Sequence, residues 1–181
     1  MADSGPETGS DLGPGLTLSL YDDSRDRPLL LNWANASNTA LWLTGRDEPV
    51  TTSDLESWRD DPGATHWVLS RDETPVGYGE IHWRDEEGYT QIMRLLVDPA
   101  RRRGGLGRSL LRALILQART QRPGQPIYAR IAPGNRAALL MYPDAGLVPL
   151  DPLPLGFDPD AVWLTAIETP PTVPGGRLDG V

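Results

Sequence analysis

Residues 97–114 read VDPARRRGGLGRSLLRAL, a glycine-rich loop that leads directly into a helical pattern. Glycines at positions 104, 105 and 107 let the backbone approach a bound ligand closely. The leucines after them recur at helical spacing, so we expect a helix over residues 106–120. The N-terminus of a helix directs unpaired N–H groups outward and attracts anions. The pattern therefore predicts a loop that binds phosphate.

Arginines surround this loop and set it apart from the rest of the chain. Residues 99–136 contain nine arginines and no acidic residue, although the whole chain has a formal net charge of −8 and contains no lysine. Arg102, Arg103 and Arg108 lie in the loop itself, where each would add a charge-assisted hydrogen bond to an anion. The acidic remainder argues against a nucleic-acid interface, which usually makes a whole domain basic. On charge alone, the arginines form either an anion site or a solvated basic helix face.

Two familiar nucleotide-binding motifs do not fit this loop. A Walker loop needs Gly-Lys-Ser/Thr, and the chain has no lysine. A dinucleotide fingerprint, G-x-G-x-x-G, would begin at Gly105 but meets Leu110 where its third glycine belongs. That fingerprint also needs an acidic residue about 20 positions further on, whereas the first acidic residue after Asp98 is Asp144. A phosphate ligand of another kind is therefore expected.

Length and composition indicate one domain without a membrane span. The chain has 181 residues, no cysteine and two histidines, His66 and His82, which excludes a disulfide framework, a thiol nucleophile and a cysteine-type metal site. It has no apolar run of about 20 residues and no signal peptide, so we expect a cytoplasmic domain. Residues 1–15 and 169–181 are rich in glycine, proline and polar residues. We expect a disordered tail at the N-terminus, a flexible tail at the C-terminus, and a single folded domain over residues 16–168.

Hydrophobic patterns predict an α+β domain around the loop. Three central strands follow one another through short turns, which is typical of an antiparallel meander. The helix expected over residues 53–61 opens with a capping box from Ser53 to Glu56. We expect strands at 16–21, 65–70, 75–83, 89–97, 126–132, 147–150 and 161–168, and helices at 27–35, 53–61, 106–120 and from Asn135 to about Pro143.

Two motifs, in this order along the chain, resemble those of a known family. Residues 102–107 read RRGGLG, directly after a strand that ends in LLVDP, and residues 135–147 read NRAALLMYPDAGL. They are similar to the Arg/Gln-x-x-Gly-x-Gly/Ala and Asn-x-x-Ala-x-x-x-Tyr-x-x-x-Gly-Phe motifs of the GNAT superfamily of acetyl-CoA-dependent N-acetyltransferases. The resemblance covers residues 16–168. It implies a GNAT-like three-layer α+β fold, in which helices flank a central mixed, mostly antiparallel sheet, and it implies acetyl-CoA as cosubstrate without a metal ion.

The resemblance also implies a role for individual residues of the two motifs. Tyr142 would protonate the departing thiolate, and Asn135 would contact the pantetheine arm of the cofactor. Leu96 and Val97 would lie where the central strands splay, with their backbone bonded to the pantetheine arm and the acetyl carbonyl. The loop backbone would hold the CoA pyrophosphate, with Arg102 as the basic residue of the motif. The residues of that backbone are Arg103, Gly104, Gly105, Leu106, Gly107 and Arg108.

Direct acetyl transfer needs a group that accepts the proton of the amine, because an alkylamine is mostly charged at neutral pH. Many members of the family place a glutamate six residues before the valine of the central strand, and Gln91 stands there in this chain. We expect Glu80 on the neighbouring strand to replace it, directly or through a water. By alternation, Val76 and Tyr78 share one face of that strand with Glu80. His82 lies on the same face and is the other candidate base.

Acidic residues gather outside the arginine-rich stretch, which favours a cationic acceptor. We expect the primary amine of a small cationic molecule, with a peptide N-terminus as the alternative acceptor. A non-catalytic CoA-binding module and an arginine-rich binding protein stay open as interpretations from other classes. We expect no nucleic-acid partner, no membrane partner, and a monomer or a homodimer. The acidic residues are Asp47, Glu48, Asp54, Glu56, Asp60, Asp61, Asp85, Glu86 and Glu87.

Overall fold

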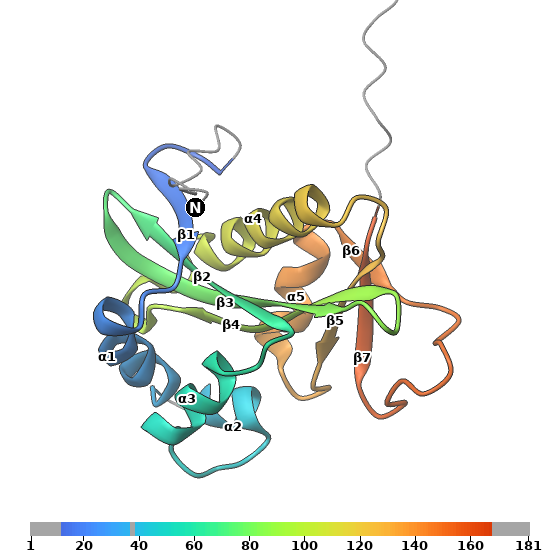
Figure 1. Cartoon of the computed structure of the whole chain (residues 1–181), viewed down its shortest axis with the longest axis horizontal. Helices are drawn as coiled ribbons and strands as arrows, with labels where there is room; N and C mark the ends of the chain where they lie inside the picture. Colours follow the sequence, from blue (N-terminus) through green and yellow to red (C-terminus); the bar gives the residue numbers. More distant parts are fainter. Residues whose placement is uncertain (1–11, 37–38, 168–181) are drawn as a thin grey trace, which may run out of the picture.

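The computed structural model describes residues 12–36 and 39–167, which form a mixed seven-stranded sheet (Figure 1). The strand order is β1-β2-β3-β4-β5-β7-β6, and within it β4 and β5 run parallel. The other neighbouring pairs are antiparallel. The strands are β1 (Leu16–Leu20), β2 (Ala64–Arg71), β3 (Thr74–Arg84), β4 (Tyr89–Val97), β5 (Ile127–Ile131), β6 (Leu147–Pro149) and β7 (Val162–Ala166).

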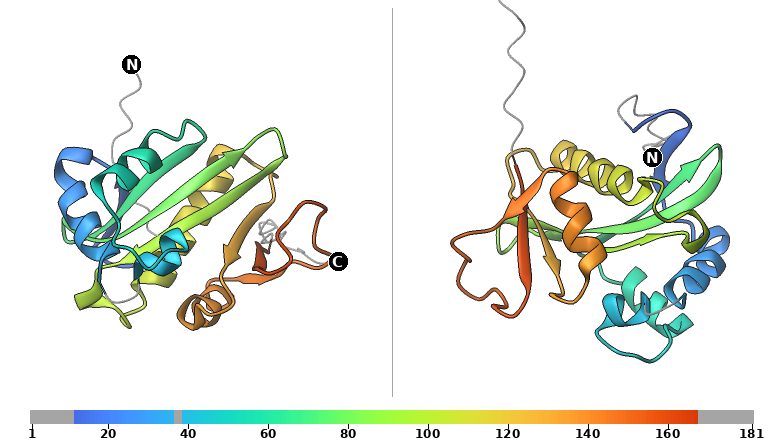
Figure 2. Two further views of the ribbon diagram at one scale, coloured as in Figure 1. Left: turned by 90° about the horizontal axis from the view of Figure 1, so that it is seen from below. Right: turned by 180° about the vertical axis from the view of Figure 1, so that it is seen from behind.

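Helices cover both faces of this sheet and complete the three-layer α+β architecture that the resemblance implied (Figure 2). Three helices, α1 to α3, lie against one face, and α4 and α5 lie against the other. A short 3₁₀ turn, η1 (Pro99–Arg101), joins β4 to the glycine loop. The helices are α1 (Asp23–Ala34), α2 (Thr39–Thr44), α3 (Thr52–Arg59), α4 (Leu106–Gln121) and α5 (Arg136–Asp144).

Two hydrophobic cores, one on each face, hold the layers together. On one face, the α4 side chains Leu110, Leu111 and Leu114 are fully buried against the sheet. Burial of such a side chain contributes roughly 1.5–3 kcal/mol, so this stripe fixes α4, and with it the glycine loop, over the sheet. On the other face, Trp58 of α3 packs in one core with Tyr78 of β3. We call these the α4-side core and the α1–α3 core.

The N-terminal cap of α3 differs from the predicted one. The Thr51 side chain accepts a hydrogen bond from the N–H of Asp54, and the Asp54 carboxylate accepts one from the N–H of Thr51. This is a capping box two residues before the predicted one, so the prediction of Ser53 and Glu56 is wrong. Both pairs have suitable residue types, and the side chains around them decide between the two.

Hydrophobic contacts select the start of α3. Val50 precedes the cap and Leu55 follows it in the first turn, and both are buried in the α1–α3 core. This contact is a hydrophobic staple, which fixes the direction in which the chain enters a helix. Helix α1 also begins earlier than the predicted range of 27–35, because the Asp22 carboxylate accepts hydrogen bonds from two N–H groups of its first turn.

Val76 leaves the face that alternation predicted for it. The register between β2 and β3 shifts next to Ser70, which makes Val76 an extra residue on β3. Val76 then packs in the α4-side core, whereas Tyr78 lies in the α1–α3 core. The prediction that Val76 shares a face with Tyr78 and Glu80 is therefore wrong.

The predicted tails, residues 1–15 and 169–181, lie outside the described residues apart from residues 12–15. Within that short part, Leu12 packs against the α4-side core, and β1 begins at Leu16. The domain boundaries at 16 and 168 stay predictions.

A bulge in β4 opens the sheet beside β5. The register between β3 and β4 shifts at this point, so that Arg94 and Leu95 together stand opposite a single residue of β3. Arg94 has a φ of 46°, which side chains other than glycine rarely adopt. Strand β4 pairs with β5 over Thr90–Ile92, and beyond these residues the two strands diverge (Figure 2). The end of β4 thus has a free edge on the side of β5.

Candidate active site

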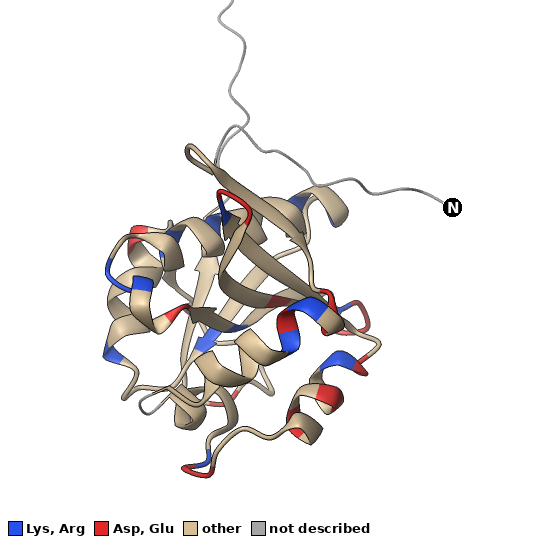
Figure 3. Ribbon diagram, turned by 90° about the vertical axis from the view of Figure 1, so that its left-hand side faces the viewer, with Lys and Arg blue, Asp and Glu red and all other residues tan. Residues whose placement is uncertain are grey.

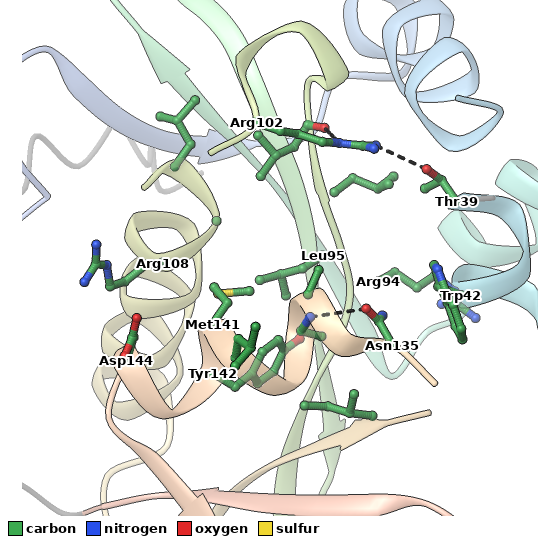
Figure 4. A pocket seen from close by; sticks show the side chains of 18 of the residues that line it. Thr39, Trp42, Arg94, Leu95, Arg102, Arg108, Asn135, Met141, Tyr142 and Asp144 are labelled. Atoms are coloured by element: carbon green, nitrogen blue, oxygen red, sulfur yellow. Dashed lines mark hydrogen bonds between the residues drawn. The ribbon is translucent and has the colours of Figure 1, made fainter. Parts of the chain in front are cut away.

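A cleft of about 680 Å³ lies where β4 and β5 diverge. Its walls come from the end of β4, the glycine loop with the start of α4, helix α5 and helix α2 (Figure 4). Nine of the ten residues expected to bind the cofactor line this cleft, and Gly104 does not. The nine are Leu96, Val97, Arg102, Arg103, Gly105, Leu106, Gly107, Arg108 and Asn135. The fold therefore brings the two sequence motifs to one place.

The glycine loop presents an open helix N-terminus to this cleft. Gly105 is the N-cap of α4 and has a φ of 78°, a left-handed conformation that glycine adopts without strain. In the part of the chain that the structure describes, no side chain caps the first turn of α4. The N–H groups of that turn can therefore bind an anion, which the helix dipole favours by roughly 0.3–1 kcal/mol.

Arg102 connects the loop to the opposite wall of the cleft. Its Nε donates to the carbonyl oxygen of Val97 at 3.3 Å, and its Nη2 donates to the hydroxyl of Thr39 on α2 at 3.2 Å. Arg108 lies on α4, on the other side of the cleft (Figure 4). The two guanidinium groups place positive charge on both sides, which attracts an anionic ligand.

Helix α5 supplies Asn135 and Tyr142 to the cleft. Asn135 caps the helix, as the sequence predicted, because its side-chain oxygen accepts a hydrogen bond from the N–H of Ala138 at 3.2 Å. Tyr142 lines the cleft although it is 6% exposed (Figure 4). Burial raises the pKa of Tyr142 well above its usual range, so the phenol keeps its proton at physiological pH. A protonated phenol at this place can act as a general acid.

Glu80 lies beneath the α1–α3 layer, in a network of hydrogen bonds. Its fully buried carboxylate accepts from the Tyr78 hydroxyl at 2.7 Å and from His82 Nε2 at 2.6 Å. Nη1 of Arg94 is a third donor, at 2.5 Å. Burial alone would raise the pKa of Glu80, but the His82 hydrogen bond and the Arg94 charge outweigh it and keep the pKa below its usual range. Glu80 is therefore an ionised carboxylate that accepts hydrogen bonds from three donors.

The position of Glu80 does not allow it to accept the proton of the amine by direct contact. Glu80 does not line the cleft, and three donors surround its carboxylate. Direct contact with an amine does not fit this arrangement, because the carboxylate is fully buried and lies away from the cleft. Action through a water stays a prediction. His82, the other candidate, is 2% exposed and already bonded to Glu80.

A protein-family model described as the acetyltransferase (GNAT) family matches residues 27–147, more than half of the chain. This chain belongs to the GNAT acetyltransferase family. The family assignment confirms the resemblance, and the seven-stranded mixed sheet with helices on both faces confirms the predicted fold class. The protein is therefore an acetyltransferase.

Solved structures of other acetyltransferases share the fold of this GNAT enzyme. The aminoglycoside acetyltransferase AAC(6')-Ib, in complex with paromomycin and acetyl-CoA, is 25% identical with a TM-score of 0.69, over 85% of this chain and 94% of that chain. A chimera of the spermidine N-acetyltransferase SpeG from Vibrio cholerae and hSSAT is 16% identical with a TM-score of 0.67, over 84% and 95%. A ribosomal-protein-alanine N-acetyltransferase from Brucella melitensis is 22% identical with a TM-score of 0.64, over 83% and 98%. A search among curated proteins finds no significant match.

Two features are absent from residues 12–36 and 39–167 of this GNAT enzyme. None of the helices there is long and apolar enough to cross a membrane. No group of three histidine or acidic side chains in the same residues is arranged as metal ligands would be.

Sequence reasoning about this acetyltransferase missed Arg94. Its side chain is 19% exposed and lines the cleft, and its guanidinium carbon lies 4.5 Å from the centre of the Trp58 ring. In the sequence, Arg94 is one arginine within a strand pattern, and the bulge that turns it into the cleft depends on the pairing of β4 with β3. Helix α2, which brings Thr39 and Trp42 to the cleft, was not predicted either.

Proposed function

We propose that this enzyme transfers the acetyl group of acetyl-CoA directly to a primary amine of a small cationic molecule. The observation that carries the proposal is the single cleft in which the open N-terminus of α4, the free edge of β4 and the protonated Tyr142 meet. These features suit the phosphates, the amide arm and the departing thiolate of a CoA thioester, in that order. The structural neighbour AAC(6')-Ib is solved with acetyl-CoA.

Different residues of the chain would bind the different parts of that donor. Backbone N–H groups of residues 103–108 would hold the pyrophosphate, and the Arg102 guanidinium would add a charge-assisted hydrogen bond. Leu96 and Val97 would bind the pantetheine arm and the acetyl carbonyl through backbone groups on the edge of β4 that β5 leaves unpaired. Asn135 would contact the same arm from α5.

Chemistry then needs a neutral amine and an acid for the leaving group. The amine nitrogen attacks the thioester carbonyl, a C–N bond forms and the C–S bond breaks. Tyr142 gives its proton to the departing thiolate and regains one from solvent, while the amine releases one proton, so the step balances. Holding the two reactants in place supplies up to about 7–11 kcal/mol of the lowering of the barrier.

We propose that Glu80 assists removal of the amine proton through a water and not by direct contact. A water in the cleft would take the proton of the amine, and the ionised Glu80 carboxylate would stabilise that proton from behind Arg94. The support for this role is the low pKa of Glu80 together with its link to the cleft through Arg94.

Charge favours a cationic acceptor. Residues 22–61, which hold α1, α2 and α3, contain nine acidic residues and four arginines, a net charge of −5. Figure 3 marks acidic residues on the helices and loops of this layer. A negative layer beside the cleft attracts cationic molecules and raises their local concentration. The names of two structural neighbours, an aminoglycoside acetyltransferase and a spermidine N-acetyltransferase, fit the same class of acceptor.

The proposal is tested by thermal unfolding with and without acetyl-CoA, followed by thiol release with a panel of amines. At 100 times its dissociation constant, acetyl-CoA should stabilise the protein by about 2.7 kcal/mol, which raises Tm by roughly 5–10 °C. Gly105→Glu places a carboxylate in the predicted phosphate site and should remove this shift. Spermidine, an aminoglycoside and a short peptide then compare the acceptor classes.

Gly124→Glu is the matched control. Gly124 also has a left-handed φ, of 78°. It lies in the loop that joins α4 to β5, outside the cleft, so the same substitution there should leave the acetyl-CoA shift intact. Absence of a shift in the wild type at millimolar acetyl-CoA would overturn the proposal. A shift without thiol release from any amine would indicate a CoA-binding module instead.

A further inference from the structure

Arg94 is held rigidly at the wall of the cleft. Its Nη1 donates to Glu80, and its guanidinium group lies over the ring of Trp58 at 4.5 Å. Glu80 is in turn fixed by the Tyr78 hydroxyl and by His82. An arginine held by an ion pair and an aromatic ring loses little further freedom when it binds a ligand.

The Nε and Nη2 groups of Arg94 do not take part in its hydrogen bond to Glu80. An arginine has five N–H donors, and the Nε and Nη2 groups together form the edge that grips a carboxylate with two parallel hydrogen bonds. Among the described residues, Arg94 Nε is buried without a hydrogen-bond partner, and Nη2 makes no hydrogen bond to another residue. A buried donor without a partner destabilises a protein unless a ligand satisfies it. The Nε and Nη2 groups of Arg94 therefore suit a ligand that carries oxygen atoms as hydrogen-bond acceptors.

Arg94 lies on the acceptor side of the cleft. In Figure 4 it extends from β4 toward Trp42 of α2, whereas Arg108 lies on α4 at the other side. The glycine loop and α4 are the parts proposed to hold the donor, so Arg94 faces the space that remains for the amine. The negative α1–α3 layer borders the same side.

We propose that Arg94 binds a carboxylate of the acceptor, close to the amine that reacts. This inference rests on the proposed function and narrows its substrate class. The preferred acceptors are amines that carry a carboxylate for Arg94 and a second ammonium group for the acidic layer, as a basic amino acid does. Arg94 is thus a specificity-determining residue, and Glu80 is the positioning residue that holds it.

Free lysine and cadaverine test this proposal, because the two diamines differ by one carboxylate. Wild-type enzyme should acetylate lysine with a kcat/KM about 10- to 100-fold above that for cadaverine, which is the range expected for hydrogen bonds to a charged group. Arg94→Gln should remove this preference. Arg94→Lys, which keeps the charge and loses the two-pronged edge, should retain part of it. The ratio between variants cancels the different intrinsic reactivities of the two amines.

Control measurements separate this proposal from the proposed function. Arg71→Gln removes an exposed arginine at the end of β2 and should leave the lysine-to-cadaverine ratio unchanged. The acetyl-CoA shift in Tm should survive in the Arg94 variants, because Arg94 is not assigned to the donor. Equal use of both diamines by the wild type would overturn the role of Arg94 and leave the acetyltransferase function intact. If Arg94→Gln does not fold, the wild-type ratio and Arg94→Lys still decide.

Discussion

Burial acts in opposite ways on Tyr142 and Glu80, and their neighbours explain the difference. Burial raises the pKa of Tyr142, and no charged group among the described residues offsets this effect, so the phenol stays protonated. Glu80 is also fully buried, but the His82 hydrogen bond and the Arg94 charge keep it ionised. Tyr142 therefore keeps its proton at physiological pH, and Glu80 carries the negative charge that pairs with Arg94.

Tyr142→Phe should lower kcat by about 10²–10⁴-fold, because the departing thiolate loses its general acid. Acetyl-CoA should still raise Tm in this variant, since the ring that packs in the cleft wall is retained. Steady-state thiol release and thermal unfolding measure the two effects. An unchanged kcat would show that solvent protonates the thiolate and that Tyr142 serves packing alone.

Glu80→Gln should destabilise the protein by about 3 kcal/mol at neutral pH, because it leaves the Arg94 cation without its partner. The folded-state pKa of Glu80 lies below the unfolded value, so its stabilising contribution is present above about pH 4.3 and is lost as pH falls. The gap between wild type and variant should therefore shrink in acid. Urea unfolding at neutral pH and near pH 4 measures it, and a gap that widens in acid would contradict the ionised state of Glu80.

Among the elements, α3 depends on a cap that lies before the predicted one. Thr51→Ala should destabilise the protein by about 1 kcal/mol, because it removes one half of the capping box. Ser53→Ala changes the residue that the sequence pattern had marked, and should cost less than about 0.5 kcal/mol. Equilibrium unfolding in urea compares the pair. Equal losses from both would mean that the Thr51 box contributes nothing to the start of α3.

Strand β4 is the element that turns this sheet into a site. Its bulge places Arg94 in a left-handed conformation just beyond Ile92, the last residue that pairs with β5, so the free edge and the arginine proposed to bind the acceptor lie side by side. A conformation of this kind costs of order 1–3 kcal/mol and persists when surrounding contacts hold it. The Glu80 ion pair and the Trp58 ring provide such contacts here.

The whole molecule is divided by charge, with arginines around the glycine loop and acidic residues in the α1–α3 layer. Acetyl-CoA is a polyanion, so its Kd should rise by roughly 3- to 10-fold when NaCl increases from about 50 to about 500 mM. Isothermal titration at the two salt concentrations measures this change. A Kd independent of salt would mean that neutral backbone contacts dominate and that the arginines are a solvated surface.

Much of the fold, and of the side of the cleft that we propose binds the donor, was predictable from near neighbours in the sequence. The strands of the meander, the leucine stripe of α4 and the cap at Asn135 arise from local periodicity and local hydrogen bonds. The glycine spacing also predicts the conformation of the loop, because Gly105 has a left-handed φ that glycine adopts freely. These features depend on residues a few positions apart.

The side of the cleft that we propose binds the acceptor arises from contacts between distant segments, which no local pattern encodes. Arg94 faces the cleft because the pairing of β4 with β3 places an extra residue there, and a shift of register moves side chains to another face. Glu80 is closed off because α1, α2 and α3, from earlier in the chain, cover its face of the sheet. Alternation placed Glu80 and His82 on a common face, but burial and hydrogen-bond partners are properties of the packed layers. Packing therefore buries Glu80 against Arg94, and its action as a base through a water stays a prediction.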